Sequence, residues 1–191
     1  MFGSEFDELI LNLKKIPGIT KKQAEKIAFY ILDLNFSELE KITTSLINVN
    51  KNLNKCITCN FISKNKQCDF CLDPSRDKQL LILENNNEVL KIENSSIFKG
   101  KYFIYNIKDE KEIENNIKKI IDFSKNIDEI IISLSPTIEG LAATNLLISK
   151  LNKEINKKIS KISFGIPIGS SIDYMDSLSI KESINNRKEV K

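Results

Sequence analysis

The feature that most constrains this chain is its use of cysteine. All four cysteines lie in two C-x-x-C pairs, Cys56–Cys59 and Cys68–Cys71, with eight residues between the pairs, and the chain has no histidine. Two pairs at this spacing can place four thiolates around one tetrahedral Zn²⁺. Four thiolates leave no open coordination position. We therefore expect one structural Zn²⁺ per chain, bound by Cys56, Cys59, Cys68 and Cys71.

Two other uses of the cysteines remain open, namely two disulfides or a redox dithiol. The acidic N-terminal segment 1–8 has neither the basic nor the apolar region of a secretory signal, which disfavours disulfides. A redox dithiol needs only one of the two pairs. A metal would also explain how residues 51–78 become ordered, because this stretch shows neither helical nor strand periodicity.

The composition limits the classes of function. The net charge of +3 over 191 residues is too small for a polycation, so any nucleic-acid contact must come from a local basic patch. A hydrophobic content of 41% favours a folded protein. The apolar runs, such as 130–132, are far shorter than the roughly 18 residues of a membrane span. We expect a soluble, cytoplasmic protein without a membrane partner or a small-molecule substrate.

The N-terminal third has helical periodicity. The spacing of apolar residues predicts a helix over 5–14 that ends before Pro17-Gly18, and a second over 21–33 capped by Thr20. A third helix is predicted over about 38–50 with Ser37 as its cap. Its expected inward-facing residues are Leu39, Ile42, Leu46 and either Ile47 or Val49.

A basic patch surrounds the turn between the first two helices. Residues 14–26 hold five lysines and one acidic residue, and Lys21, Lys22 and Lys26 lie at the start of the second helix. Two helices joined by a tight Pro-Gly turn present backbone N–H groups that bind a phosphate without reading a base. This is typical of a helix-hairpin-helix DNA-binding element. An ordinary helical corner with solvated lysines is the alternative.

The pattern from residue 79 onward alternates between strands and helices. Apolar runs predict strands at 80–83, 102–105, 130–132 and 159–164. The intervening helices are expected over 86–93, 109–124 (capped by Asp109), 138–151 and finally 177–187. The fold class is therefore α/β in several parts, with a parallel-rich sheet covered by helices on both faces.

Carboxylates follow two of these strands. Glu84 ends the first strand, Glu88 lies four residues on, and Glu139 follows the third strand. The acid after the first strand suggests a Toprim arrangement, in which an Asp-x-Asp after the third strand completes a Mg²⁺ site. Here that position reads Ser133-Leu134-Ser135. A Mg²⁺-dependent phosphoryl-transfer enzyme using Glu84, Glu88 and Glu139 is thus disfavoured. Partner binding by Glu84 and Glu139, or a purely local structural use, remain open.

The segment 165–176 holds two glycines, a proline and two acids, Asp173 and Asp176. It lacks the Gly-Lys-Ser/Thr of a P-loop, so we do not expect a nucleoside triphosphate there. Asp173 and Asp176 are either a pair of acids or, more in line with their propensity, helix caps. The apolar residues in and after this loop favour a subunit contact.

The order of these motifs resembles the RecR family of bacterial recombination mediators over about residues 5–187. The resemblance implies a helix-hairpin-helix region (1–53), a four-cysteine zinc finger (54–77), a Toprim domain (78–170) and a C-terminal loop and helix for oligomer contacts (171–191). It implies a non-enzymatic DNA-repair protein whose four subunits form a ring around DNA. It also implies partnership with RecO, and in some bacteria RecF, in loading RecA at single-strand gaps.

The same resemblance assigns DNA contacts to Lys22 and Lys26, to which the local charge adds Lys21. Three departures from the family pattern stand out. Thr20 replaces a second hairpin glycine, Leu141 and Ala143 replace an acid and a threonine, and Phe164 replaces a histidine. The second departure weakens inferences about partner contacts near Glu139.

Overall fold

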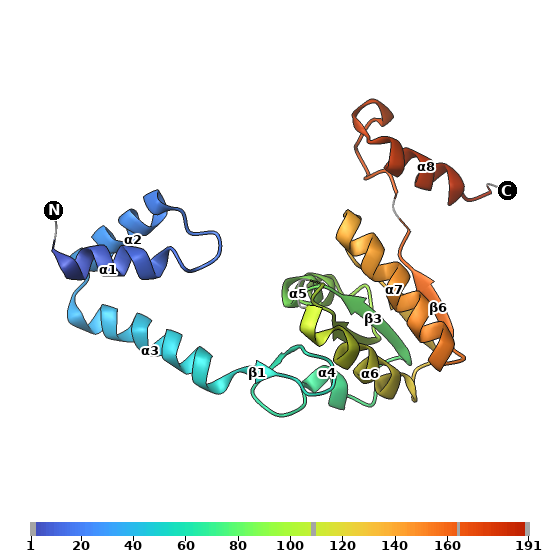
Figure 1. Ribbon diagram of the computed structural model, residues 1–191, viewed down its shortest axis with the longest axis horizontal. Coiled ribbons are helices and arrows are strands. Elements are labelled where there is room, and N and C mark those ends of the chain that lie inside the picture. Colours follow the sequence, from blue (N-terminus) through green and yellow to red (C-terminus); the bar gives the residue numbers. More distant parts are fainter. Residues whose placement is uncertain (1–2, 108–109, 164, 190–191) are drawn as a thin grey trace. The chain divides into compact units, whose positions relative to one another are not determined.

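The computed structural model describes residues 3–107, 110–163 and 165–189. The chain divides into two compact units, residues 1–53 and 54–191, and each is described by itself (Figure 1).

The first unit is helical. It consists of α1 (Ser4–Leu13), α2 (Lys21–Asp33) and α3 (Phe36–Asn52). Helices α1 and α2 lie against each other and bury Phe6, Ala24 and Ala28. The rings of Phe6 and Phe29 are 5.1 Å apart. The small alanines let the two helices approach closely, and the first two predicted helices are confirmed to within a residue.

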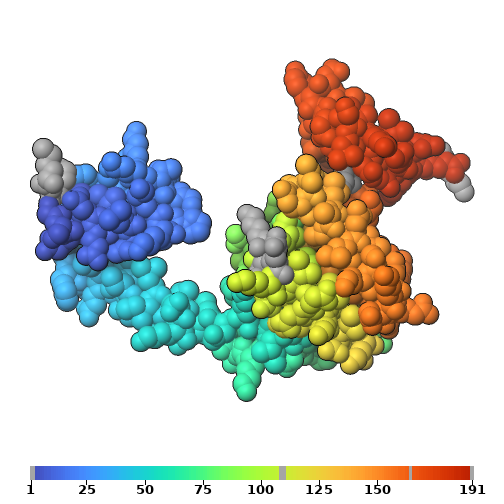
Figure 2. All heavy atoms as spheres, in the orientation of Figure 1, coloured from blue at the N-terminus to red at the C-terminus, as the bar shows by residue number. Residues whose placement is uncertain are grey.

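Helix α3 differs from the prediction in two respects. Its N-cap is Asn35 rather than Ser37, because Asn35 Oδ1 accepts from the Glu38 amide at 3.0 Å while the Glu38 carboxylate accepts from the Asn35 amide. The prediction that one apolar side of α3 faces inward was wrong for the single chain, because no residue of α3 is buried in it. Figure 2 shows α3 continuing beyond the α1–α2 pair, which cannot cover its far turns. The exposed residues include Phe36, Ile42, Leu46, Ile47 and Val49.

The second unit begins with a small cysteine module. Strands β1 (Asn54–Lys55) and β2 (Ile62–Ser63) pair antiparallel, and a single helical turn, α4 (Asp69–Leu72), follows. Elements this short bury little apolar surface. The module is therefore held by its cysteine cluster and by the sheet beside it.

The rest of the second unit is an α/β sheet in the order β4-β3-β5-β6, with every neighbouring pair parallel. The strands are β3 (Gln79–Leu83), β4 (Lys101–Ile104), β5 (Glu129–Ile132) and β6 (Lys158–Lys161). The helices are α5 (Asn86–Ser95), α6 (Ile113–Ser124) and α7 (Ile138–Glu154). Since crossovers between parallel strands are right-handed, this strand order puts α5 on one face and α6 with α7 on the other. The α/β prediction is confirmed. The core lies between these layers and includes Leu80, Ile82, Phe103, Ile120, Ile130 and Leu147.

The remaining elements refine the predicted boundaries. A short 3₁₀ turn, η1 (Glu110–Glu112), leads into α6, and the predicted cap Asp109 lies outside the described residues. Strand β6 ends at Lys161, earlier than predicted, and Phe164 also lies outside the described residues.

The C-terminal segment contains η2 (Ile172–Tyr174) and α8 (Ser177–Asn185). Asp176 caps α8, because its carboxylate accepts from the Ser179 amide at 2.9 Å and from the Ser179 hydroxyl at 2.6 Å. This confirms the cap interpretation for Asp176. The same interpretation was wrong for Asp173, which lies inside η2, whose N-cap is Ser171. No helix in the described part of the chain is both long enough and apolar enough to cross a membrane.

Candidate functional site

The four cysteines come together as the spacing predicts. The Sγ atoms of Cys56, Cys59, Cys68 and Cys71 all lie within 4.8 Å of one another. The Cys59–Cys68 and Cys56–Cys71 sulfurs are 3.4 and 3.9 Å apart, and all four thiols are free. A tetrahedron of sulfurs around Zn²⁺ has edges of about 3.8 Å, from a Zn–S bond of about 2.3 Å. The donor set fits a structural metal ion, and the two-disulfide alternative is not observed.

Backbone groups shape the module around these sulfurs. The amide of Cys68 donates to Cys56 Sγ at 3.3 Å, and the amide of Ile57 donates to the Lys66 carbonyl at 2.9 Å. Asn60 has a left-handed backbone with φ of 63°, which turns the chain directly after Cys59. Asparagine tolerates this conformation better than most residues.

The crowded sulfurs make the cluster a site for a cation. Hydrogen bonds from Cys59 and then Cys71 stabilise the Cys68 thiolate and lower its pKa to about 2. The hydrogen bond to Cys68, the bond to Cys71 and burial raise the pKa of Cys59. The Cys68 thiol therefore loses its proton readily, while the Cys59 thiol resists losing its own. A bound divalent cation supplies the compensating charge that four thiolates need.

The module is joined to the sheet through Asn60 and Cys59. The amide of Ile104 donates to the Cys59 carbonyl at 2.8 Å, and Asn60 Nδ2 donates to the Ile104 carbonyl at 3.0 Å. Asn60 Nδ2 also donates to Asn116 Oδ1 at 2.9 Å, and Lys119 Nζ donates to Asn60 Oδ1 at 2.9 Å. A single side chain therefore connects the module to β4 and to α6.

A second connection centres on Arg76, one of two arginines in the chain. Its guanidinium donates to both oxygens of Glu93 at 2.8 Å and to the Gly100 carbonyl at 2.7 Å. It lies over the Phe70 ring, 4.5 Å from the centroid, and Tyr102 OH donates to Glu93. Hydrogen bonding from Arg76 lowers the pKa of the Glu93 carboxyl. The scarcity of arginine marks Arg76 as informative, but no sequence pattern identifies Glu93 as its partner.

The basic patch of the first unit lies where the sequence predicts. Thr20 caps α2 in a capping box with Gln23, in which Thr20 Oγ1 accepts from the Gln23 amide and Gln23 Oε1 accepts from the Thr20 amide at 2.8 Å. Gly18 has φ of +86°, a conformation that the hairpin turn requires and that glycine adopts without strain. Lys22 and Lys26 are exposed, and Lys21 lies 3.8 Å from Glu25. Thr20, which stands where the pattern it resembles has a second glycine, therefore serves as the N-cap of α2.

The carboxylates at the sheet edge serve the local backbone. Glu84 Oε1 accepts from the Ser135 amide at 2.5 Å, and Glu88 accepts from the Glu84 amide at 2.9 Å. Glu139 is exposed on the first turn of α7. The cysteines are the one group of three or more potential metal ligands that the described residues bring together. Glu84, Glu88 and Glu139 therefore do not form a three-carboxylate centre.

The first turn of α7 lies close to the loop that follows β5. Thr137 caps α7 through a bond from the Gly140 amide. A Cβ at Gly140 would lie 2.0 Å from the Ser135 carbonyl oxygen. Together with Glu84, this contact fixes the loop that occupies the place of Asp-x-Asp.

The parallel sheet, the reversal of its strand order between β3 and β5, and the attached four-cysteine module define a Toprim protein with a candidate metal site. Residues 78–163 match the family model described as Toprim domain, and residues 165–188 match that described as RecR, C-terminal. Recombination protein RecR of Mycoplasmopsis pulmonis (strain UAB CTIP) is 44% identical over 197 residues, covering 98% of this chain and 100% of the relative. The RecR proteins of Francisella philomiragia and Finegoldia magna are each 32% identical, covering 100% of this chain and 98% and 99% of themselves.

The chain belongs to the RecR family. The resemblance seen in its motifs is confirmed, and family membership gives the chain a role in DNA recombination and repair.

Proposed function

We propose that this protein is a DNA-binding recombination mediator that acts with RecO, and with RecF where it is present, to help load RecA at single-strand gaps. The DNA-binding part of this proposal depends on the groups at the N-terminus of α2. The first-turn amides of Lys21 and Lys22 have no acceptor within the helix, and the helix dipole adds partial positive charge there. Lys22 and Lys26 are exposed beside them. These groups suit a phosphate and carry no means of reading a base.

The Lys22→Ala, Lys26→Ala double variant tests this assignment. Each chain neutralises about two or three phosphates through this patch, so binding falls with salt at a log–log slope of about −0.9 per phosphate. The double variant should bind every DNA sequence more weakly and with a shallower slope. Fluorescence anisotropy of labelled duplexes at several salt concentrations measures both quantities.

A matched variant controls for lost positive charge. Lys91 and Lys118 are exposed lysines on α5 and α6, so Lys91→Ala, Lys118→Ala removes the same charge elsewhere. The control should bind DNA almost as the unmodified protein does. Equal weakening in both double variants, or none in the Lys22, Lys26 variant, would refute the α2 site and leave the hairpin as a helical corner.

We assign a structural Zn²⁺ to Cys56, Cys59, Cys68 and Cys71. The support is the sulfur spacing and the all-thiolate donor set, which favours Zn²⁺ and has no place for a substrate. The ion would hold the module together and supply no reactive ligand. Metal analysis of the purified protein should give one Zn²⁺ per chain.

The proposed function is not enzymatic. Glu84 already holds the Ser135 amide, and Ser133-Leu134-Ser135 offers no carboxylate to complete a Mg²⁺ site. A supercoiled plasmid incubated with the protein and Mg²⁺ should therefore remain uncut. Nicking that is lost on Glu84→Gln would favour the phosphoryl-transfer alternative.

We also propose that the chain works as a dimer or a ring tetramer. The exposed apolar side of α3 and the exposed Ile168, Ile172 and Leu178 of the C-terminal segment support subunit contacts. Several α2 patches on one duplex would bind through effective concentration. Light scattering should show no monomer at high micromolar concentration. Glu84 and Glu139 remain candidates for partner contacts, with the exposed Glu139 better placed for one.

A further inference from the structure

A cavity of about 620 Å³ lies in the second unit between the cysteine module and the carboxyl ends of β3 and β4. Glu84 and Asn85 line it from the end of β3, and Ile104 and Asn106 from the end of β4. Ligands of open parallel sheets bind beyond the carboxyl ends of the strands, close to the switch in strand order. Here that switch lies between β3 and β5. The cavity lies beyond the carboxyl ends of β3 and β4, next to that switch and on the β4 side of it.

The lining of this cavity is rich in amides. Six of its 13 lining residues are asparagines, against 21 asparagines among 191 residues in the whole chain. Its charged residues balance, with Glu84 and Glu112 against Lys55 and Lys119. Several of these amides already bond to protein groups, among them Asn60 to Asn116, Asn85 to Glu88 and Asn115 to Glu112. A nucleobase, an uncharged group with several donors and acceptors, would meet the donors and acceptors that remain. Ile57 and Ile104 add apolar wall for the face of the ring.

Part of this lining is held rigidly. The bonds among Asn60, Asn116, Lys119 and the Ile104 carbonyl, all between 2.9 and 3.0 Å, fix these side chains in place. A preorganised wall binds without first ordering its side chains. Asn115 stands on the exposed side of α6, where its amide donates to Glu112 at 2.7 Å.

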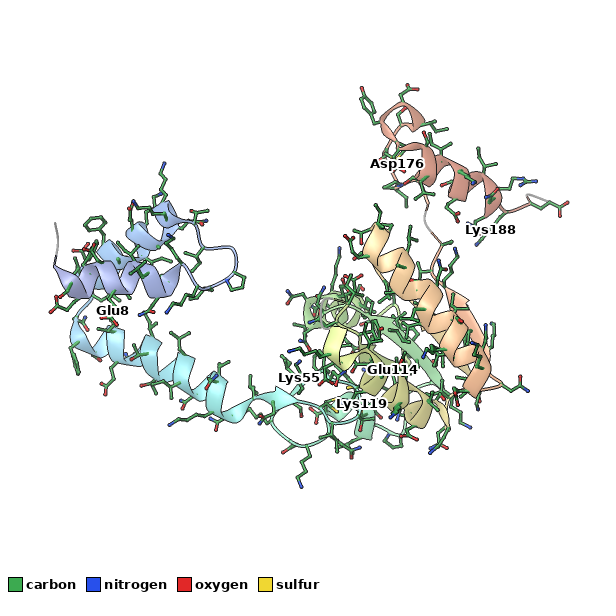
Figure 3. All side chains as sticks on the ribbon, in the orientation of Figure 1. Glu8, Lys55, Glu114, Lys119, Asp176 and Lys188 are labelled. Atoms are coloured by element: carbon green, nitrogen blue, oxygen red, sulfur yellow. The ribbon has the colours of Figure 1, made fainter. Side chains whose placement is uncertain are left out.

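Two cations are placed beside the amides. Figure 3 shows Lys55 on β1 and Lys119 on α6, and both line the cavity. Lys55 is exposed and Lys119 is half-buried. An ammonium group next to a base-sized cavity can bind the phosphate attached to that base. The second cavity of this region, of about 580 Å³, shares Ile57 and Lys119 with the first.

We propose that this cavity binds one nucleotide, with its base among the asparagines and its phosphate on Lys55 and Lys119. We expect the nucleotide to be an unpaired one of single-stranded DNA, and this choice rests on the proposed DNA-binding function. A free nucleotide has the same chemistry and is the other source. Duplex DNA is excluded because its bases are stacked and paired, so the site would distinguish gapped from intact DNA.

The test uses the full chain loaded with Zn²⁺ and labelled with ¹⁵N. Titration with dAMP should shift the side-chain amide signals of Asn60, Asn115 and Asn116, with a dissociation constant in the millimolar range. Deoxyribose 5-phosphate, which has the phosphate and no base, should leave the Asn115 amide signal in place. It should shift only Asn60 and Asn116, which are bonded to Lys119 directly and through Asn60. The oligomer (dA)₈ should compete with dAMP if single-stranded DNA is the source, and should fail to compete if the source is a free nucleotide.

Two variants locate the site. Asn115→Leu removes one exposed amide and should weaken dAMP binding about tenfold, the equivalent of one hydrogen bond. Ile57→Glu places a negative charge at a side chain that is 58% exposed and should abolish binding without unfolding the module. Asn94→Leu, the same change on the exposed surface of α5, is the matched control and should bind normally.

Four results would overturn the proposal. They are the absence of amide shifts with 10 mM dAMP, an equal shift of Asn115 with deoxyribose 5-phosphate, normal binding by both site variants, and displacement of dAMP by Mg²⁺ alone. The outcome is separable from that of the proposed α2 site. The Lys22→Ala, Lys26→Ala variant should lose duplex binding and keep dAMP binding, whereas Ile57→Glu should do the reverse.

Discussion

Arg76 offers a direct test of how the cysteine module and the sheet stabilise each other. The perturbation is Arg76→Met, which keeps the apolar stem over Phe70 and removes the guanidinium. That change deletes two bonds to Glu93 and one to the Gly100 carbonyl. The side chains of Arg76 and Glu93 are only 14% and 25% exposed. Solvent therefore screens the pair weakly, and Glu93 is left with Tyr102 alone.

The magnitude follows from these contacts. Removing one partner of a largely buried, hydrogen-bonded ion pair costs about 3 to 5 kcal/mol, and the partial exposure places Arg76→Met near the lower end, at about 3 kcal/mol. Arg76→Lys keeps the positive charge and loses the bidentate hydrogen bonding to Glu93, so we expect it to destabilise the protein by about half as much. A loss of about 3 kcal/mol accelerates exchange from opened states on the order of 100-fold.

Hydrogen exchange of the β3 and β4 amides in the Zn²⁺-loaded protein is the appropriate assay. It reports the local opening of the region that Arg76 connects. The control is Arg187→Met at the other arginine, which is exposed and donates to the Ile184 carbonyl within its own helix end. The reasoning fails if Arg76→Met and Arg187→Met change the opening free energy equally, or if Arg76→Met changes it by less than about 0.5 kcal/mol, the range of ordinary surface substitutions.

Three further predictions concern the second unit. Cys56→Ser or Cys71→Ser should lose the metal and increase proteolysis within 51–78, as measured by metal analysis and mass spectrometry; stoichiometric disulfides in the unmodified protein would contradict the site. Gly140→Ala should destabilise by about 1 to 3 kcal/mol in urea unfolding, because its Cβ would meet the Ser135 carbonyl at 2.0 Å, whereas Gly165→Ala has open space and should be neutral. Arg76 holds the pKa of Glu93 below its usual range, so this pair stabilises above about pH 4.3 and the contribution is lost as the pH falls through the folded pKa. Urea titrations between pH 7 and 3 should show this loss in the unmodified protein and a smaller one in Arg76→Met.

Local chemistry was predictable from the sequence. The cysteine spacing predicts the four-thiol cluster, and Thr20 before an apolar helical pattern predicts the start of α2. The apolar runs identify all four strands of the sheet. Each of these signals lies within about 15 residues, where residue spacing and local geometry determine the outcome.

The contacts that join the parts were not predictable in the same way. Arg76 and Glu93 are 17 residues apart, and Asn60 reaches Asn116 across 56 residues. Such pairs depend on how the strands and helices pack, which no local period encodes. The same limit explains Glu84, whose position after a strand suggested a ligand while its carboxylate holds the Ser135 amide. It also explains the wrong prediction for α3: helical spacing predicts an apolar face, but it does not predict which element covers that face.

The bonding between Cys59 and Ile104 has a consequence for solubility. Strand β4 is at one edge of the sheet, and alternate amides of an edge strand face outward, free to pair with another chain. The Ile104 amide and carbonyl are both occupied by the cysteine module. At the other edge, β6 carries Lys158 and Lys161, whose charges discourage pairing. Metal loss would therefore uncover a strand edge as well as loosen a module. The apo protein should form β-rich aggregates before its helices melt.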